Sequence, residues 1–150
     1  MVVDKHRKNN QQGSASDAFS DDLLRDTATR KAYSATAMKA FLRLMDIWQL
    51  STVDRCAILG DIPKQTYYKW ARGEVGTLSR DQLERIGITL GIHKGLQLLF
   101  SSEAGGMRWF KSANSDYTFR GLSPLERMTK GGMTDLYAVR RYLDAMRGSG

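Results

Sequence analysis

Apolar residues recur at three- and four-residue intervals along most of the chain, and no stretch alternates apolar and polar residues as a β-strand does. From Ser20 this periodicity predicts a helix to about Tyr33, with Ser20 as its N-cap. A second apolar stripe begins near Ser34 and predicts a helix that ends around residues 49–51. Residues 1–17 are polar and lack the periodicity, which predicts a flexible arm. The pattern as a whole predicts an all-α protein.

Between Ser51 and Gly73 the chain has the pattern of two short helices joined by a tight turn. Ser51 and Asp54 match a capping box at the start of the first helix, and Gly60 ends that helix. Pro63 follows in the turn and opens the second helix, because its fixed φ suits a first turn. This is the spacing of a helix-turn-helix, the motif whose second helix enters the major groove of DNA.

The second of these helices has two different faces. Tyr67 and Trp70 are three residues apart and are predicted to pack inward. The outward side chains are of types that contact base edges or phosphates, with Gln65 suited to adenine and Lys69 to guanine. We therefore predict DNA contacts from Lys64, Gln65, Thr66, Tyr68, Lys69 and Arg72. Two short helices with such a turn can also pack against protein, and this alternative stays open.

A longer helix is predicted after Ser79, which is its N-cap. Glycines at 87, 91 and 95 lie inside it, where they permit a close neighbouring helix but weaken the helix itself. We therefore expect a bend or break near Gly91. Beyond it the pattern predicts a helix over about 103–111, a polar loop over 112–121, and helices over about 123–130 and 134–147.

The composition is typical of a protein that folds in water, with 41% apolar and 26% charged residues among 150. The sequence has no signal peptide and no apolar run of membrane-spanning length, and its single cysteine, Cys56, excludes an internal disulfide. These features predict a cytoplasmic protein. The net charge of +7 favours an anionic partner, such as nucleic acid or an acidic protein surface. Most of the excess lies in residues 107–150, which carry eight Lys or Arg and four Asp or Glu.

Catalytic and metal chemistry have few candidate residues in this sequence. The two histidines are His6, in the predicted arm, and His93, too few for a histidine metal site or a Ser-His-Asp triad. Cys56 lies on the apolar side of its helix and is predicted to be a core residue. The glycines lack the preceding strand of a phosphate-binding loop. We therefore expect no enzymatic activity, no metal and no cofactor.

Two parts of the chain carry a family resemblance. The segment IPKQTYYKWARGE (62–74) resembles the second helix of Xre-family repressors. The elements LGIHKGLQLLF (90–100), RWF (108–110), FRGLSPLERM (119–128) and DLYAVRRYLDAMRG (135–148) are similar to the toxin-binding domain of the Xre/MbcA/ParS antitoxin family. The chain departs from the family at Ala113, where a proline often precedes the asparagine.

The resemblance implies a division of the chain and a function. An extension over 1–33 is followed by an Xre-like helix-turn-helix domain over 34–90 and a toxin-binding domain over 91–150. The protein would be the antitoxin of a type II pair that covers the active site of a RES-domain toxin, an enzyme that consumes NAD. It would also repress its own operon as a homodimer on two-fold operator DNA, with the helices before Ser51 as the dimer surface.

The toxin contacts are expected at the end of the chain, where aromatic and cationic residues gather. We predict that these contacts come from Trp109, Tyr137, Arg140, Arg141, Asp144, Arg147, Gly148, Ser149 and Gly150. The same aromatic residues can instead form the core, and the arginines a solvated helix face. The sequence leaves two other functions open. The protein could be a helix-turn-helix regulator without a toxin partner, or an adaptor that binds protein and does not bind DNA.

Overall fold

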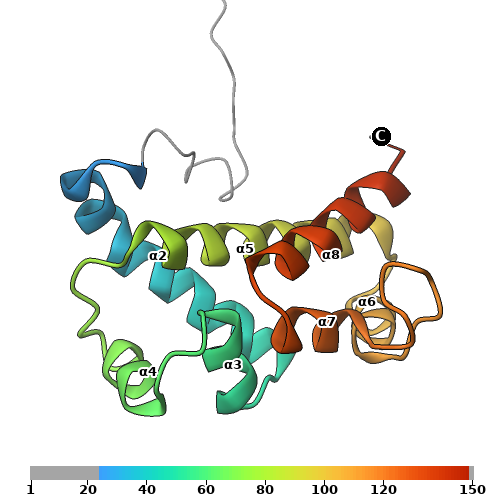
Figure 1. Cartoon of the computed structure of the whole chain (residues 1–150), viewed down its shortest axis with the longest axis horizontal. Helices are drawn as coiled ribbons and strands as arrows, with labels where there is room; N and C mark the ends of the chain where they lie inside the picture. The colour runs from blue at the N-terminus through green and yellow to red at the C-terminus, as the bar shows by residue number, and fades with distance from the viewer. Residues whose placement is uncertain (1–23, 149–150) are drawn as a thin grey trace, which may run out of the picture.

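The computed structural model describes residues 24–148, and within that range there are seven α-helices and no β-strand, which confirms the predicted fold class. The predicted arm, the start of the helix expected from Ser20, Ser149 and Gly150 lie outside the described residues. In chain order the helices are α2 (Thr27–Trp48), α3 (Thr52–Ile58), α4 (Lys64–Ala71), α5 (Arg80–Leu99), α6 (Glu103–Lys111), α7 (Pro124–Lys130) and α8 (Met133–Met146) (Figure 1). None of them combines the length and apolarity that a membrane-spanning helix requires.

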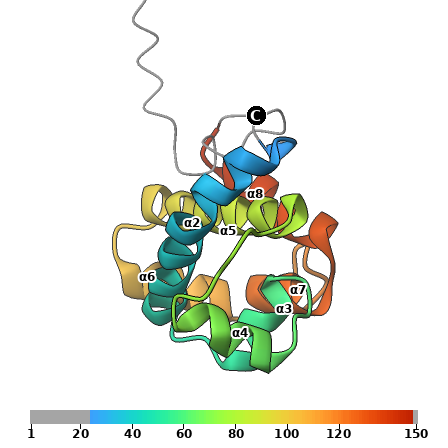
Figure 2. The ribbon, with the colours of Figure 1, turned by 90° about the vertical axis from the view of Figure 1, so that its left-hand side faces the viewer.

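Helix α5 is the central element of the fold and packs against α2, α6 and α8. It runs along the long axis of the molecule, with α2 packed across it and α8 beside its C-terminal half (Figure 1). Helices α3 and α4 lie below its N-terminal half and α6 and α7 below its C-terminal half, and the turned view shows the same two levels (Figure 2). The core is continuous through both halves, and its largest fully buried side chains include Phe41, Trp48, Phe110 and Phe119.

The break predicted between Tyr33 and Ser34 is wrong, because α2 is one helix of 22 residues from Thr27 to Trp48. Its N-cap is Asp26, whose carboxylate accepts hydrogen bonds from the amides of Ala28 and Thr29. Ser34 is fully buried inside the helix. Its hydroxyl donates to the carbonyl of Arg30 (2.6 Å) and accepts from the amide of Leu78 (2.8 Å). The serine therefore ties α2 to the loop before α5 and caps no helix.

The bend predicted near Gly91 is also wrong, because α5 is one helix from Arg80 to Leu99. The glycines instead serve the other role considered for them, the close approach of a neighbouring helix. A Cβ atom at Gly91 would lie 2.9 Å from Cζ of Arg140, and one at Gly95 would lie 3.3 Å from Cβ of Leu143, both on α8. Packing against α8 holds α5 straight where its own sequence favours a break.

The other predicted helix starts are confirmed at the level of single hydrogen bonds. Ser79 with Gln82 and Ser123 with Glu126 each form a complete capping box, at the starts of α5 and α7. Ser51 accepts from the amide of Asp54 at the start of α3. Pro63 is the N-cap of α4, one position before the expected first turn. These local signals set the boundaries of most helices.

Candidate functional site

Helices α3 and α4 form the predicted helix-turn-helix. The turn between them contains Gly60 with φ 96° and Asp61 with φ 57°, both in the left-handed region. Tyr67 and Trp70 are buried, with 6% and 8% of their surfaces exposed, which confirms the predicted inward face of α4. The other face of α4 is therefore turned away from the core.

The six predicted DNA-contacting residues lie on this outward face or at its end. All are exposed except Thr66, which is half-buried, and Tyr68 keeps 48% of its surface exposed. Arg72 is the C-cap of α4, and its Nη2 lies 3.7 Å from a carboxylate oxygen of Glu74, so its charge is partly engaged within the chain. No observation on the protein tests the contacts of these residues with DNA, which stay predictions.

Arg55 on α3 holds the motif together, a role that the sequence analysis missed. Its Nη1 donates to the hydroxyl of Tyr67 (2.9 Å) and lies 3.0 Å from the carboxylate of Asp46. Its Nε donates to the carbonyl of Leu50 (2.9 Å) and its Nη2 to that of Met45 (3.3 Å). Burial alone would lower the pKa of Arg55, but the bonds to the hydroxyl and the carboxylate raise it. The guanidinium therefore fixes α4 relative to α2.

Trp109 on α6 lies inside a cluster of aromatic rings. Its ring is stacked on that of Tyr142 with centroids 5.9 Å apart. The Phe119 ring meets it edge-on and the Phe100 ring is tilted against it, each with centroids 5.8 Å away. The cluster joins α6, α8 and the loop before α7. Trp109 is half-buried there, so most of its ring surface contacts the protein itself and only part can meet a partner.

The predicted toxin-binding residues on α8 occupy different sides of that helix. Tyr137 and Arg141 face solvent, and Arg141 Cζ lies 5.9 Å from the tyrosine ring centroid. Arg140 is half-buried against α5, over Gly91.

At the end of α8, Arg147 Nη2 pairs with the carboxylate of Asp144 at 2.8 Å, and Gly148 follows, exposed, with φ 73°. Of the residues predicted on α8, Tyr137 and Arg141 are therefore the pair most accessible to a partner.

A partly buried ion pair between Asp135 and Arg127 joins the start of α8 to α7. Arg127 Nε lies 2.6 Å from one carboxylate oxygen of Asp135, and the amide of Gly132 donates to the other (2.7 Å). Burial would raise the pKa of Asp135, but these two bonds together lower it. Arg127 also donates to the carbonyl of Thr118. The pair therefore fixes the loop 112–121 against α7 and α8.

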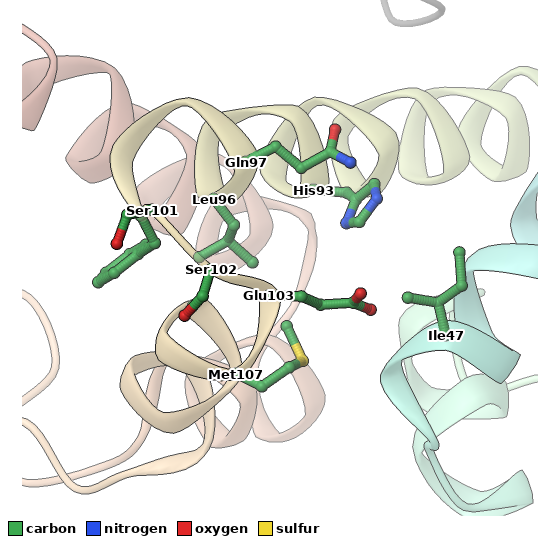
Figure 3. A pocket seen from close by; sticks show the side chains of 10 residues that line it. Ile47, His93, Leu96, Gln97, Ser101, Ser102, Glu103 and Met107 are labelled. Atoms are coloured by element: carbon green, nitrogen blue, oxygen red, sulfur yellow. The ribbon is translucent and has the colours of Figure 1, made fainter.

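A cavity of about 250 Å³ lies between α2, α5 and α6 (Figure 3). Figure 3 shows the imidazole of His93, the carboxylate of Glu103 and the side chains of Ile47 and Met107 around it. The Nδ1 atom of His93 accepts a hydrogen bond from Trp48 Nε1 (3.3 Å), and burial lowers the pKa of His93 although Glu103 acts in the opposite direction. His93 is therefore a neutral packing residue.

The residues 24–148 contain no cluster of three or more His, Cys, Asp or Glu side chains that could hold a metal ion. Cys56 is buried, as predicted, and burial raises the pKa of its thiol above the usual value. A buried thiol with a raised pKa is a poor nucleophile.

Comparison with known families assigns α4 and α8 to two different domains. Residues 26–87 match the antitoxin Xre-like helix-turn-helix domain, and residues 95–148 match the antitoxin Xre/MbcA/ParS C-terminal toxin-binding domain. The uncharacterized protein y4oB of Sinorhizobium fredii is 40% identical over 111 residues, which are 74% of this chain and 84% of that protein. The chain therefore belongs to the family of Xre-type antitoxins that join a helix-turn-helix domain to an Xre/MbcA/ParS toxin-binding domain.

Proposed function

We propose that this antitoxin neutralises a RES-domain toxin, an enzyme that consumes NAD, by covering the entrance of its active site. The observation that carries the proposal is the match of residues 95–148 to a toxin-binding domain, together with the solvent-facing pair Tyr137 and Arg141 in that segment. Tyrosine and arginine supply most of the binding energy at many protein interfaces. An exposed, cationic surface suits an acidic rim around the toxin's active site.

The neutralising role is tested by measuring NAD consumption by the purified toxin of the same operon. Deleting α8 is a poor test because Leu136, Val139 and Leu143 belong to the core, so the deletion would unfold the protein. We propose instead the double variant Tyr137→Ala/Arg141→Glu, which changes solvent-facing side chains only.

The wild-type protein should abolish NAD consumption at equimolar concentration. The double variant should need at least about 30-fold more protein, as expected for the loss of an interface hot spot. A control variant of the same charge change is Lys94→Glu, on the exposed side of α5. Full NAD consumption in the presence of excess wild-type protein contradicts the proposed neutralisation.

We propose further that the protein represses its own operon through α4. Gln65 and Lys69 are exposed on the face of α4 that is turned from the core, as base readout in the major groove requires. Repressors of this type bind two-fold operators, so we propose a homodimer, with the segment before Ser51 as its surface. Operator binding would place the protein in the cytoplasm.

A gel-shift titration with the upstream DNA tests this second role. Gln65→Ala should relax the preference for the operator, with a cost of about 1–3 kcal/mol for the base pair it reads. Lys64→Ala should weaken binding to all sequences and reduce the salt slope by about one. Unchanged binding of both variants would favour the protein-binding adaptor, and operator binding without any toxin in the operon would favour a regulator that acts alone.

A further inference from the structure

Two exposed tyrosine–arginine pairs lie on the surface of the toxin-binding segment. In the loop before α7, Arg120 Cζ lies 4.9 Å from the ring centroid of Tyr117, and Arg120 Nη2 donates to the Tyr117 hydroxyl (3.1 Å). On α8, Arg141 lies over the ring of Tyr137. Tyr117 keeps 81% of its surface exposed, the largest value among the large apolar side chains of the described residues. Each pair joins a planar cation to an aromatic ring.

These two arginines differ from their neighbours in what balances their charge. Nearby cations form ion pairs within the chain, namely Arg127 with Asp135, Lys130 with Glu126, and Arg147 with Asp144. Within residues 24–148, Arg120 and Arg141 form no such pair, and each has a tyrosine beside it instead. A guanidinium has five N–H donors. Most donors of Arg120 therefore remain available to a carboxylate from outside the chain.

The loop that carries Tyr117 and Arg120 has a fixed conformation. The amide of Asn114 donates to the carbonyl of Leu122 (3.0 Å), and the amide of Gly121 donates to the carbonyl of Asn114 (2.8 Å). Arg120 has φ 51°, in the left-handed region that is uncommon for residues other than glycine. The surrounding hydrogen bonds hold this conformation, so the arginine is oriented before any partner binds. Such preorganisation reduces the entropy that binding costs.

A shallow hollow of about 520 Å³ connects this loop to α8. It is lined by Tyr117, Thr118, Arg120, Arg127, Asp135 and Ala138. Ala138 follows Tyr137 on α8, so the hollow extends from the Tyr117–Arg120 pair to the part of α8 that carries Tyr137. Its one acidic residue, Asp135, is already bound to Arg127 at 2.6 Å. The free charge around the hollow is therefore positive.

We propose that the two pairs, Tyr117–Arg120 and Tyr137–Arg141, form one docking surface for a carboxylate-bearing segment of the toxin. The proposal rests on the proposed function and deepens it by naming the chemistry of the partner segment. Arginine binds carboxylates through two parallel N–H bonds, and the tyrosines supply rigid contact area. DNA is a less suitable partner here, because the loop 112–121 lies at the opposite end of the long axis from α4 (Figure 1).

The experiment measures the dissociation constant between the full-length protein and the purified RES-domain toxin of the same operon by titration calorimetry. Arg120→Glu should weaken binding at least about 30-fold, because repulsion replaces a hot-spot contact. Arg120→Lys should weaken it about tenfold, because an ammonium keeps the charge but lacks the planar fork. Tyr117→Ala should also weaken it about tenfold. The control Lys94→Glu, with the same charge change on the exposed side of α5, should stay within about threefold of the wild type.

Operator binding and thermal unfolding of each variant show whether the effect is confined to this surface. Both should match the wild type, because the Arg120 side chain is exposed and bonds only to the exposed Tyr117. If Arg120→Glu binds the toxin as tightly as Lys94→Glu does, the docking surface is wrong while the proposed neutralisation stands. If Arg120→Glu loses operator binding instead, the surface serves DNA and the proposal is overturned. If the wild-type protein does not bind the toxin, the proposed function fails and this inference fails with it.

Discussion

The hydrogen bond between Arg55 and Tyr67 should contribute measurable stability to the helix-turn-helix, and a double-mutant cycle can isolate it. The cycle uses Tyr67→Phe, which removes only the hydroxyl, and Arg55→Met, which keeps the aliphatic stem and removes the guanidinium. The two atoms are 2.9 Å apart, and the Arg55 side chain is only 16% exposed. The bond is therefore charge-assisted and largely shielded from water.

The expected sizes follow from the partners that each variant leaves behind. Tyr67→Phe should cost about 1 kcal/mol, because Arg55 keeps its three other acceptors. Arg55→Met should cost about 2–4 kcal/mol, since Asp46 and the carbonyl of Leu50 each lose the Arg55 donor and the carbonyl of Met45 keeps only its backbone donor. The coupling between the two changes should be about 1 kcal/mol. Asp46→Asn should cost at most about 0.5 kcal/mol, because the Asp46 side chain is 74% exposed.

The assay is equilibrium unfolding in urea of the wild type, both single variants and the double variant, under conditions where the transition is two-state. Tyr68→Phe is the matched control, since it removes a hydroxyl from an exposed neighbour on the same helix. It should change the free energy of unfolding by less than about 0.5 kcal/mol. Additive costs for Arg55→Met and Tyr67→Phe, within about 0.3 kcal/mol, would refute the role given to the guanidinium.

Three further predictions test the packing and the titrating groups by the same measurement. Gly95→Ala should lower the free energy of unfolding by about 1 kcal/mol relative to Gly91→Ala. The methyl group at position 95 would lie 3.3 Å from Cβ of Leu143, which cannot move without the backbone, whereas the methyl group at position 91 would meet the end of the flexible Arg140 side chain. His93→Gln should flatten the loss of stability that begins as the pH falls below about 6.5, the ordinary pKa of histidine. A lowered folded-state pKa means that the unfolded state binds the proton more tightly, so stability falls as the pH falls below that value. Asp135→Asn should cost most above about pH 4 and less in stronger acid, because a carboxylate with a lowered pKa stabilises the fold only while it is ionised.

Helix boundaries were predictable from the sequence where the signal is local. The N-cap role of Ser79 and the helix start at Ser123 need only residues within one turn, and both are confirmed. The capping box predicted at Ser51 forms in part, because the Asp54 amide donates to the Ser51 hydroxyl but α3 has no return bond from the Asp54 side chain. The face of α4 was also predictable from the local sequence, because the three-residue spacing of Tyr67 and Trp70 sets which side is buried. Periodicity and capping chemistry are therefore sufficient for elements that depend on their own sequence.

The two incorrect predictions concern residues whose environment is set by distant parts of the chain. Ser34 has the chemistry of a cap, yet its hydroxyl accepts from the amide of Leu78, 44 positions later. Gly91 weakens a helix in isolation, yet here it faces Arg140 of α8. Neither contact has a signature in the neighbouring residues. The glycine spacing in the sequence is the same whether a neighbouring helix packs closely there or the helix breaks, so the sequence could not distinguish the two.

The site residues divide in the same way. Exposure of Lys64, Gln65 and Lys69 follows from helical spacing, whereas the burial of Trp109 among other rings depends on where α6 and α8 meet. Arg55 was missed because its acceptors lie on α2, the loop after α2, and α4. A charged residue inside the apolar segment of a predicted helix-turn-helix is the one signal that could have identified it.

The position of α5 indicates that the two binding surfaces belong to one folding unit. The matched domains end at residue 87 and begin again at residue 95, so the interval between them lies in the middle of one continuous helix. The same core buries Leu83 and Ile86 before that interval, Ile92 within it and Leu96 after it. Trp48 of α2 also contacts His93 and Phe110, and its carbonyl accepts from Lys111 of α6 (2.7 Å). A cut within α5 would therefore expose apolar surface in both halves, because buried residues of one core lie on each side of the cut. The surface of α4 and the surface around α8 are held in a fixed relation by that helix.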